Sequence, residues 1–189
     1  KCSKLKDVII PSSLKKISSS AFEECSSLLS IIIPSSVTEI CEYAFCLCSN
    51  LRQISIPSSV TVIGEYAFCL CSNLNQFEIP SSVTKIANYT FRGCSKLTKI
   101  DIPSSITEIG KYAFHQCKNL NEILIPSSVK QIGEFTFSEC ESLNIITIPS
   151  SLNDVDKLDL TSSKMKLVDN GVYISKYRIT VPKELNDYE

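Results

Sequence analysis

The chain is short of the residues that most often build active sites. Its 189 residues include one histidine, one methionine, five glycines and no tryptophan. One histidine cannot make a metal-binding or charge-relay cluster, and no glycine-rich phosphate loop is present. We therefore expect no enzyme, no metal and no cofactor, and we expect His115 to be an ordinary surface side chain.

Strong charge and long apolar runs are also missing. The formal net charge is −1, so the basic patch that nucleic acid or a membrane surface would need is absent. No apolar run approaches the roughly 20 residues that span a bilayer. The 43% hydrophobic content is enough for one folded core. No signal peptide is visible, and a start at Lys1 rather than methionine suggests a piece of a longer or processed chain.

What the chain does contain is a strict repeat. Proline recurs every 23 residues, at Pro11, Pro34, Pro57, Pro80, Pro103, Pro126 and Pro149. A fixed period of this size is typical of stacked, structurally equivalent units, so we predict a repeat solenoid of seven units.

Each unit predicts one short strand. The pattern Leu-x-x-Ile-x-Ile-Pro alternates apolar and other residues, as in Leu97, Ile100 and Ile102, and Pro103 ends it. Strands at the same point of every unit should pair in parallel and in register. The rest of each unit then forms a short helical or irregular crossover. Its Pro-Ser-Ser start should hold a turn through the serine hydroxyls.

Three residue columns predict the packing. The phenylalanines should form a continuous aromatic spine, and the cysteine three residues after each of them should be a small buried side chain at the end of a helical turn. A column of small residues that includes Cys41 and Gly64 indicates close backbone approach. The third column, Tyr43, Tyr66, Tyr89, Tyr112 and Phe135, could shield the core or offer a stacking platform to a ligand.

These columns resemble the BspA-type leucine-rich repeats, a 23-residue class of that superfamily. The matching elements are the Leu-x-x-Ile-x-Ile-Pro strand, the Ile-Gly-x-x-Ala-Phe crossover and the cysteine before the next leucine, from about Cys2 to Leu152. The resemblance implies a right-handed leucine-rich-repeat superhelix, with its parallel sheet on the concave face and its crossovers on the convex face. It also implies a protein of the cell surface or a secreted protein, often adhesive, without catalytic residues.

The residues two and four before each proline should point outward on the concave face. Exposed apolar side chains there would form a contact surface, because solenoids create extended concave sites. The alternative is that scattered surface apolar residues are ordinary. The candidate partner-binding residues are Ile9, Ile32, Gln53, Ser55, Gln76, Glu78, Lys99, Asp101, Glu122, Leu124 and Ile145.

Cys46 and Cys69 stand outside the cysteine column, at equivalent positions of adjacent units. We expect them in an outward-facing column, where they could be free thiols or a disulfide between units. A zinc site with Cys48 and Cys71 is disfavoured, because the four sulfurs should not converge.

The two ends differ. The first strand, Leu5 to Ile10, should be an open edge suited to end-to-end self-association. We assign residues 1–155 to the solenoid and 156–189 to a non-repeat cap, or to an island between two repeat arrays. Residues 172–181 suggest a β-hairpin there.

The function favoured by these observations is a non-catalytic scaffold that binds a protein partner, in adhesion or surface recognition. The alternative is a structural or assembly module of a larger complex, which could be intracellular. Localisation would separate the two, because adhesion requires the cell surface or the exterior.

Overall fold

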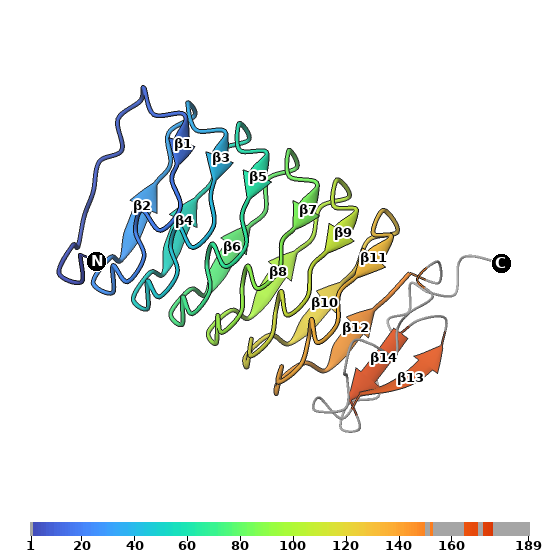
Figure 1. Ribbon diagram of the computed structural model, residues 1–189. Coiled ribbons are helices and arrows are strands. Elements are labelled where there is room, and N and C mark those ends of the chain that lie inside the picture. Colours follow the sequence, from blue (N-terminus) through green and yellow to red (C-terminus); the bar gives the residue numbers. More distant parts are fainter. Residues whose placement is uncertain (1, 150–151, 153–164, 170–171, 176–189) are drawn as a thin grey trace.

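The protein is a β-solenoid in which each 23-residue unit makes one circuit (Figure 1). The computed structural model describes residues 2–149, 152, 165–169 and 172–175. These include six complete circuits and the first part of a seventh. The expected solenoid with parallel strands is confirmed.

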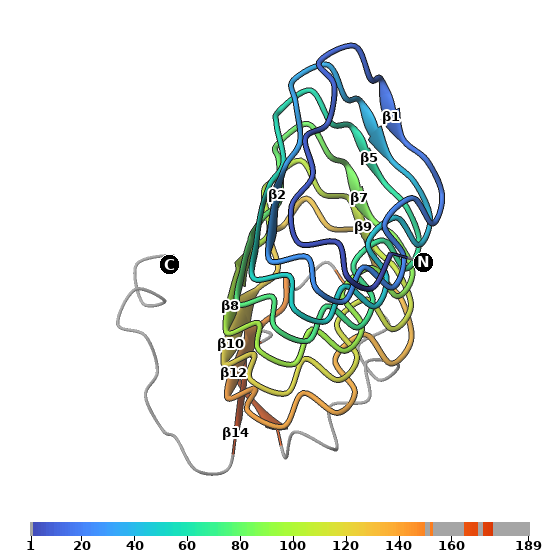
Figure 2. The ribbon, with the colours of Figure 1, turned by 90° about the vertical axis from the view of Figure 1, so that its left-hand side faces the viewer.

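Every complete circuit after the first carries two strands, where one was expected. Three-residue strands precede each proline, and two-residue strands follow it; Figure 2 shows the two sets on opposite sides of the solenoid. The three-residue strands are β2 (Ser30–Ile32), β4 (Gln53–Ser55), β6 (Gln76–Glu78), β8 (Lys99–Asp101), β10 (Glu122–Leu124) and β12 (Ile145–Thr147). The two-residue strands are β1 (Lys16–Ile17), β3 (Glu39–Ile40), β5 (Val62–Ile63), β7 (Lys85–Ile86), β9 (Glu108–Ile109) and β11 (Gln131–Ile132).

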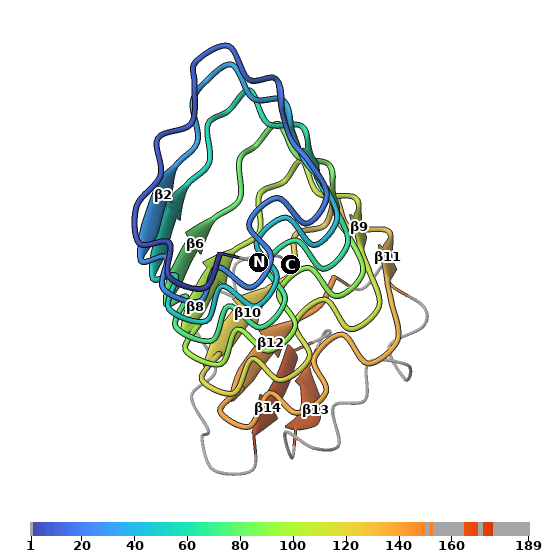
Figure 3. The same cartoon turned by 60° about the vertical axis from the view of Figure 1, so that its left-hand side comes forward.

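The paired strands β1 to β12 of the repeat units are parallel and one repeat apart in sequence. Ser30 lies opposite Gln53 in β2 and β4, and Lys85 lies opposite Glu108 in β7 and β9. Only such a register places each side chain on its counterpart in the next unit. The circuits consequently lie one behind another with similar outlines, each offset from the one before it (Figure 3).

The core lies inside the circuits and follows from the alternation of each strand. In β2 the central Ile31 is buried, while Ser30 and Ile32 on either side of it are exposed. Each long strand and each short strand contributes one apolar side chain to the interior. The Leu, Phe and Cys columns fill the rest of it. Burial of these side chains is the main favourable term in folding.

The phenylalanine spine is present as expected. Phe22, Phe45, Phe68, Phe91, Phe114 and Phe137 stack with ring centroids 5.2–5.9 Å apart and interplanar angles of 7° or less. The longest step lies between Phe68 and Phe91. Phe77 of β6 packs edge-on against both rings there, with centroid distances of 4.8 and 4.7 Å.

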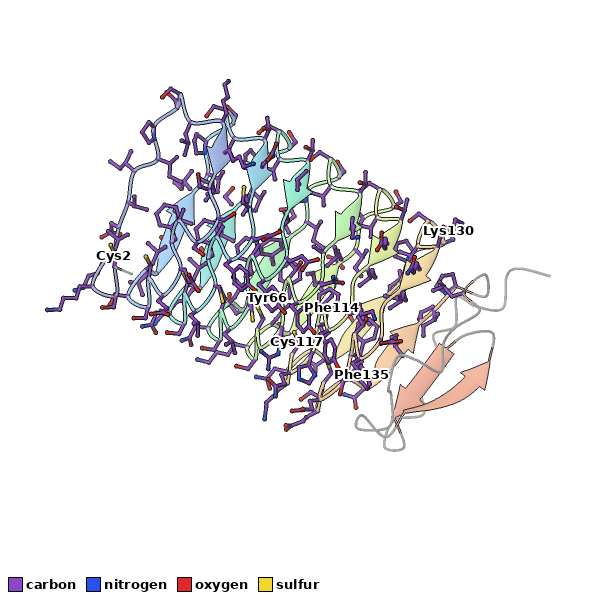
Figure 4. The ribbon with its side chains drawn as sticks, viewed as in Figure 1. Cys2, Tyr66, Phe114, Cys117, Lys130 and Phe135 are labelled. Atoms are coloured by element: carbon purple, nitrogen blue, oxygen red, sulfur yellow. The ribbon has the colours of Figure 1, made fainter. Side chains whose placement is uncertain are left out.

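The cysteine column is buried, and its thiols also make hydrogen bonds. Cys71 donates from Sγ to the carbonyl oxygen of Phe45 at 3.1 Å, and Cys117 donates to that of Phe91 at 3.2 Å. The same bond recurs at Cys48, Cys94 and Cys140. Each thiol thus bonds the adjacent unit, a role that a purely apolar side chain could not fill. Figure 4 labels Cys117 and Phe114 from these two columns.

The expected helical turn between phenylalanine and cysteine is wrong. Along this turn segment (residues 41–48 in the second unit), two residues four apart take left-handed backbone angles, with φ of 56° at Tyr43 and 61° at Leu47. Tyr43, Phe45 and Leu47 donate their N–H groups to the next unit at 2.8–3.0 Å, and the residues between them bond three residues back. Hydrogen bonding to the neighbouring unit replaces the bonding that a helix would need.

The column of small residues makes the close approach that was expected. A Cβ atom at Gly64 would lie 2.6 Å from the backbone nitrogen of Glu42, and one at Gly110 would lie 2.6 Å from that of Asn88. The serines of Pro-Ser-Ser bond backbone as expected, but between units. Ser36 donates to the carbonyl of Leu14 at 2.6 Å, and Ser59 donates to that of Val37 at 2.7 Å.

Both ends depart from expectation. Residues 5–10 form no strand, so the edge strand predicted there is wrong, and β2 is the first strand of its sheet. At the other end, β14 (Val172–Ser175) pairs antiparallel with β12 and with β13 (Met165–Asp169). Both edges of β14 are therefore occupied, and the expected hairpin partner at 178–181 lies outside the described residues.

Candidate functional site: the long-strand face

The candidate surface is the outer side of the three-residue strands, together with residues 7 and 9, and we call it the long-strand face. The expected outward orientation is confirmed for ten of the eleven candidate residues, which are exposed. Ile9, Ile32 and Leu124 are 94%, 78% and 65% exposed. Among the described residues these are the three most exposed large hydrophobic side chains.

Ile145 is the exception among the candidates. It is half-buried, and so is Thr147, whose strand β12 pairs with β14 at the end of the sheet. Ile145 lies opposite Ile174 in that pairing. The edge of the sheet that was expected to be free is therefore paired, and the last exposed apolar candidate on the face is Leu124.

Charges on this face are arranged differently from those elsewhere. Four ion pairs join residues one unit apart on the short-strand and turn segments: Lys16–Glu39, Lys85–Glu108, Lys111–Glu134 and Lys118–Glu141, at 2.8–3.2 Å. On the long-strand face Lys99 pairs with Asp101 of its own strand at 3.2 Å. Within the described part of the chain no ion pair joins two units across this face. Glu78 and Glu122 therefore remain available to a partner.

The tyrosine column forms a stack of its own. Consecutive rings from Tyr43 to Phe135 have centroids 4.4–5.1 Å apart and lie within 20° of parallel. Figure 4 labels Tyr66 and Phe135 of this column. Burial, followed by the neighbouring tyrosine hydroxyls, raises the pKa of Tyr66 to about 12. The rings cover one another's faces, so the inner ones have no free face for a ligand to stack on.

The column that holds Cys46 and Cys69 does not face outward, which corrects the expectation. Cys46 and Cys69 are buried, at 6% and 2% exposure. In the same column His115 is half-buried rather than a surface residue. Its ring packs edge-on against Tyr112 at 5.4 Å, and its Nε2 lies 3.7 Å from Glu139.

Metal and membrane sites can be assessed only for the part of the chain that the structure describes. In that part no three His, Cys, Asp or Glu side chains come together in an arrangement that could hold a metal ion. No helix in the same residues is long and apolar enough to cross a membrane.

The fold and its columns define a leucine-rich-repeat solenoid. A family model of the BspA-type leucine-rich-repeat region matches residues 1–98 and 62–171, in six copies. The chain belongs to the BspA-type leucine-rich-repeat family.

Solved structures of bacterial proteins share this architecture. A leucine-rich repeat protein from Bacteroides ovatus is 31% identical with a TM-score of 0.76, over 80% of this chain and 39% of the other. The Treponema pallidum leucine-rich repeat protein is 34% identical with a TM-score of 0.63, over 65% and 59%. A leucine-rich cell surface protein from Faecalibacterium prausnitzii is 29% identical with a TM-score of 0.59, over 85% and 46%. The chain thus spans about two-fifths to three-fifths of these proteins, and no curated protein matches it.

Sequence reasoning missed the short strands and the antiparallel strand on β12. The short strands had a weak signal, because a second apolar residue recurs six positions after every proline, as at Ile40 and Ile63. A two-residue strand is too short to alternate, so periodicity could not reveal it.

Proposed function

We propose that the protein is a non-catalytic scaffold that binds a protein partner through its long-strand face. The observation that carries this proposal is the position of its most exposed apolar side chains. Ile9, Ile32 and Leu124 all lie on this face, at its two ends, and polar residues lie between them. Large apolar side chains exposed on one face are typical of contact surfaces.

The polar centre would supply specificity. Gln53 and Gln76 project from the successive strands β4 and β6, and Glu122 projects from β10 beyond Lys99 of β8, with Glu78 and Asp101 on β6 and β8. Hydrogen-bonding groups in one plane can select a partner by charge and register. Ser55, Lys99 and the residues named above complete the proposed site.

The biological setting that fits this surface is adhesion or recognition outside the cell. Support comes from the family and from the Faecalibacterium relative, which is described as a cell surface protein. The alternative, an assembly module inside a larger complex, would use the same face on a permanent partner. Localisation of the full-length protein distinguishes them, because confinement to the cytoplasm rules out adhesion.

The test begins with the whole 189-residue chain as bait for extracellular-matrix and cell-surface protein extracts. A captured protein is then titrated against the chain and against the double variant Ile32→Ser/Leu124→Ser. We expect at least tenfold weaker binding for the double variant, because two anchoring side chains are lost. Val62→Ser is the matched control, since Val62 is an exposed apolar residue on the short-strand face.

Two outcomes would contradict the proposal. If the double variant binds as tightly as the parent chain, the long-strand face is not the site. If the folded protein captures nothing specific from either extract, the adhesion function itself fails.

A further inference from the structure

A second site lies inside the turn segments, away from the long-strand face. Glu23, Cys46, Cys69 and Arg92 occupy one column on four successive units. Two thiols thus lie side by side, with a carboxylate before them and a guanidinium after them. Packing of the solenoid does not need cysteine here, because the same column accepts His115 and Ser138 in later units.

The two cysteines are held at equivalent places on neighbouring units. The rings on either side of them set the spacing: Phe45 and Phe68 are 5.4 Å apart and Tyr43 and Tyr66 are 4.6 Å apart. The N–H of Leu47 also donates to the carbonyl of Cys69 at 2.8 Å. A spacing of about 5 Å falls within the range of roughly 4.4–6.8 Å between Cα atoms that a disulfide bridges.

Spacing alone does not single out this pair, because the core cysteines are also one unit apart. What differs is the hydrogen bonding. Each core thiol from Cys48 to Cys140 donates to a backbone carbonyl at 3.0–3.3 Å, and burial raises its pKa. Neither Cys46 nor Cys69 donates its thiol to a backbone carbonyl of the described residues, so both sulfurs are left for each other, and Arg92 occupies the same column one unit after Cys69. The thiol of Cys46 and then the guanidinium of Arg92 lower the pKa of Cys69 against the effect of burial, which favours its thiolate, the nucleophilic form.

We propose that Cys46 and Cys69 are a reversible oxidation site that closes into a disulfide between the second and third units. The oxidant is a peroxide, because a small oxidant suits thiols that are only 6% and 2% exposed. The Cys69 thiolate attacks one peroxide oxygen and the O–O bond breaks. The departing hydroxide takes a proton and leaves as water, and Cys69 becomes a sulfenic acid.

The second step uses the neighbouring thiol. Cys46 loses its proton and its sulfur attacks the Cys69 sulfur, which forms the S–S bond and breaks the S–O bond. The departing hydroxide takes that proton and leaves as a second water. Overall, the two thiols are oxidised by two electrons and one hydrogen peroxide is reduced to two waters. The bond ties two units together covalently, and a dithiol reductant reverses it.

The experiment treats the reduced, folded chain with a stoichiometric series of hydrogen peroxide. Thiols that remain are alkylated after denaturation, and the peptides are mapped by mass spectrometry. We expect one linked pair, Cys46 with Cys69, to form first and to return to two thiols with dithiothreitol. The five neighbouring core pairs from Cys25 to Cys140 are internal controls with the same spacing.

The variant Arg92→Gln tests the role of the guanidinium. Because the thiolate loses its cationic neighbour, we expect the linked pair to form about tenfold more slowly at pH 7. The proposal is overturned if the core pairs link as readily as Cys46 and Cys69. It is also overturned if peroxide oxidises only the exposed Cys2 while Cys46 and Cys69 stay reduced in folded protein.

Discussion

At the scale of single residues, the phenylalanine spine carries much of the packing. Phe114 has no exposed surface and stacks on both faces, at 5.5 Å from Phe91 and 5.8 Å from Phe137. We predict that Phe114→Ala lowers the free energy of unfolding by about 3–5 kcal/mol, because it leaves a cavity between two rings. Urea unfolding measures the change. Phe135→Ala is the control, since Phe135 is 39% exposed, and an equal loss in both variants would contradict this account.

Left-handed backbone angles give a second prediction at this scale. The fourth residue after the tyrosine position has a positive φ, and it is glycine only at Gly93 (72°), whereas Gln116 holds 61°. An L-residue in this region costs roughly 1–2 kcal/mol. Gln116→Gly should therefore stabilise the protein by up to about 1 kcal/mol, after the entropy cost of glycine.

The reciprocal change supplies the control for this prediction. Gly93→Ala should destabilise by about 1–2 kcal/mol, since a Cβ there would also lie 2.6 Å from Cδ2 of Leu70. Thermal or urea unfolding of the two variants should give opposite signs. Shifts of the same sign would mean that backbone angle does not limit stability at this position.

At the scale of repeated elements, the column of core thiols makes stability depend on pH. Burial raises the pKa of Cys48 and Cys140 to about 12, and raises those of Cys71, Cys94 and Cys117 well above 9.0. Below the unfolded pKa, near 9, these thiols are neutral in both states and their contribution to stability is intact. Above it, only the unfolded chain loses protons, so stability falls as pH rises towards the folded pKa.

We therefore predict that the free energy of unfolding decreases from about pH 9 to pH 12 under reducing conditions. Each thiol adds a slope of up to about 1.4 kcal/mol per pH unit. Urea midpoints at pH 8, 9 and 10 measure it, and Cys71→Ser should reduce the slope because serine does not titrate there. A stability that is flat from pH 8.5 to 10 would argue against burial of these thiols.

At the scale of the whole molecule, the two ends of the solenoid differ in their strand pairing. The antiparallel strand β14 covers the edge of β12, and Ile145 is half-buried at that junction. We predict that a chain ending at residue 152 associates at micromolar concentration, because an exposed parallel edge invites pairing with another copy. Sedimentation velocity measures the association.

A rescue variant makes this prediction specific. Ile145→Lys in the shortened chain should restore the monomer, because a charge on an edge strand opposes pairing. If the shortened chain stays monomeric without the lysine, β14 does not protect the edge.

Most of the fold could be predicted from the sequence because the same type of residue recurs at the equivalent position of several units. The proline period predicted stacked units, the Phe column predicted a buried spine, and the small residues near Gly64 predicted close backbone approach. The structure confirms all three. The outward direction of Ile32 and Leu124 followed from alternation with buried neighbours. Whether they bind a partner stays a prediction.

The errors all concern segments in which neighbouring units, rather than local sequence, supply the hydrogen bonds. The turn segment was expected to be helical, yet Phe45 donates its N–H to Ala67 of the next unit at 2.8 Å. Cys46 and Cys69 were expected to be exposed but are buried, which spacing along the chain could not show. Residues 5–10 have the strand pattern without the strand, because they do not pair with β2 of the next unit.

By itself, the sequence determined the repeat length, the in-register stacking and the identity of the core columns. It could do so because, in a solenoid with a 23-residue period, each core side chain packs on the equivalent side chain of the next unit. The tertiary structure alone decided which groups on the outside are free. Ion pairs between units use the charges of the short-strand and turn segments, β14 pairs along β12 opposite Ile145, and Cys46 and Cys69 are buried in the stacked units. Those contacts join residues that local pattern does not link, so they appear only when the units are stacked.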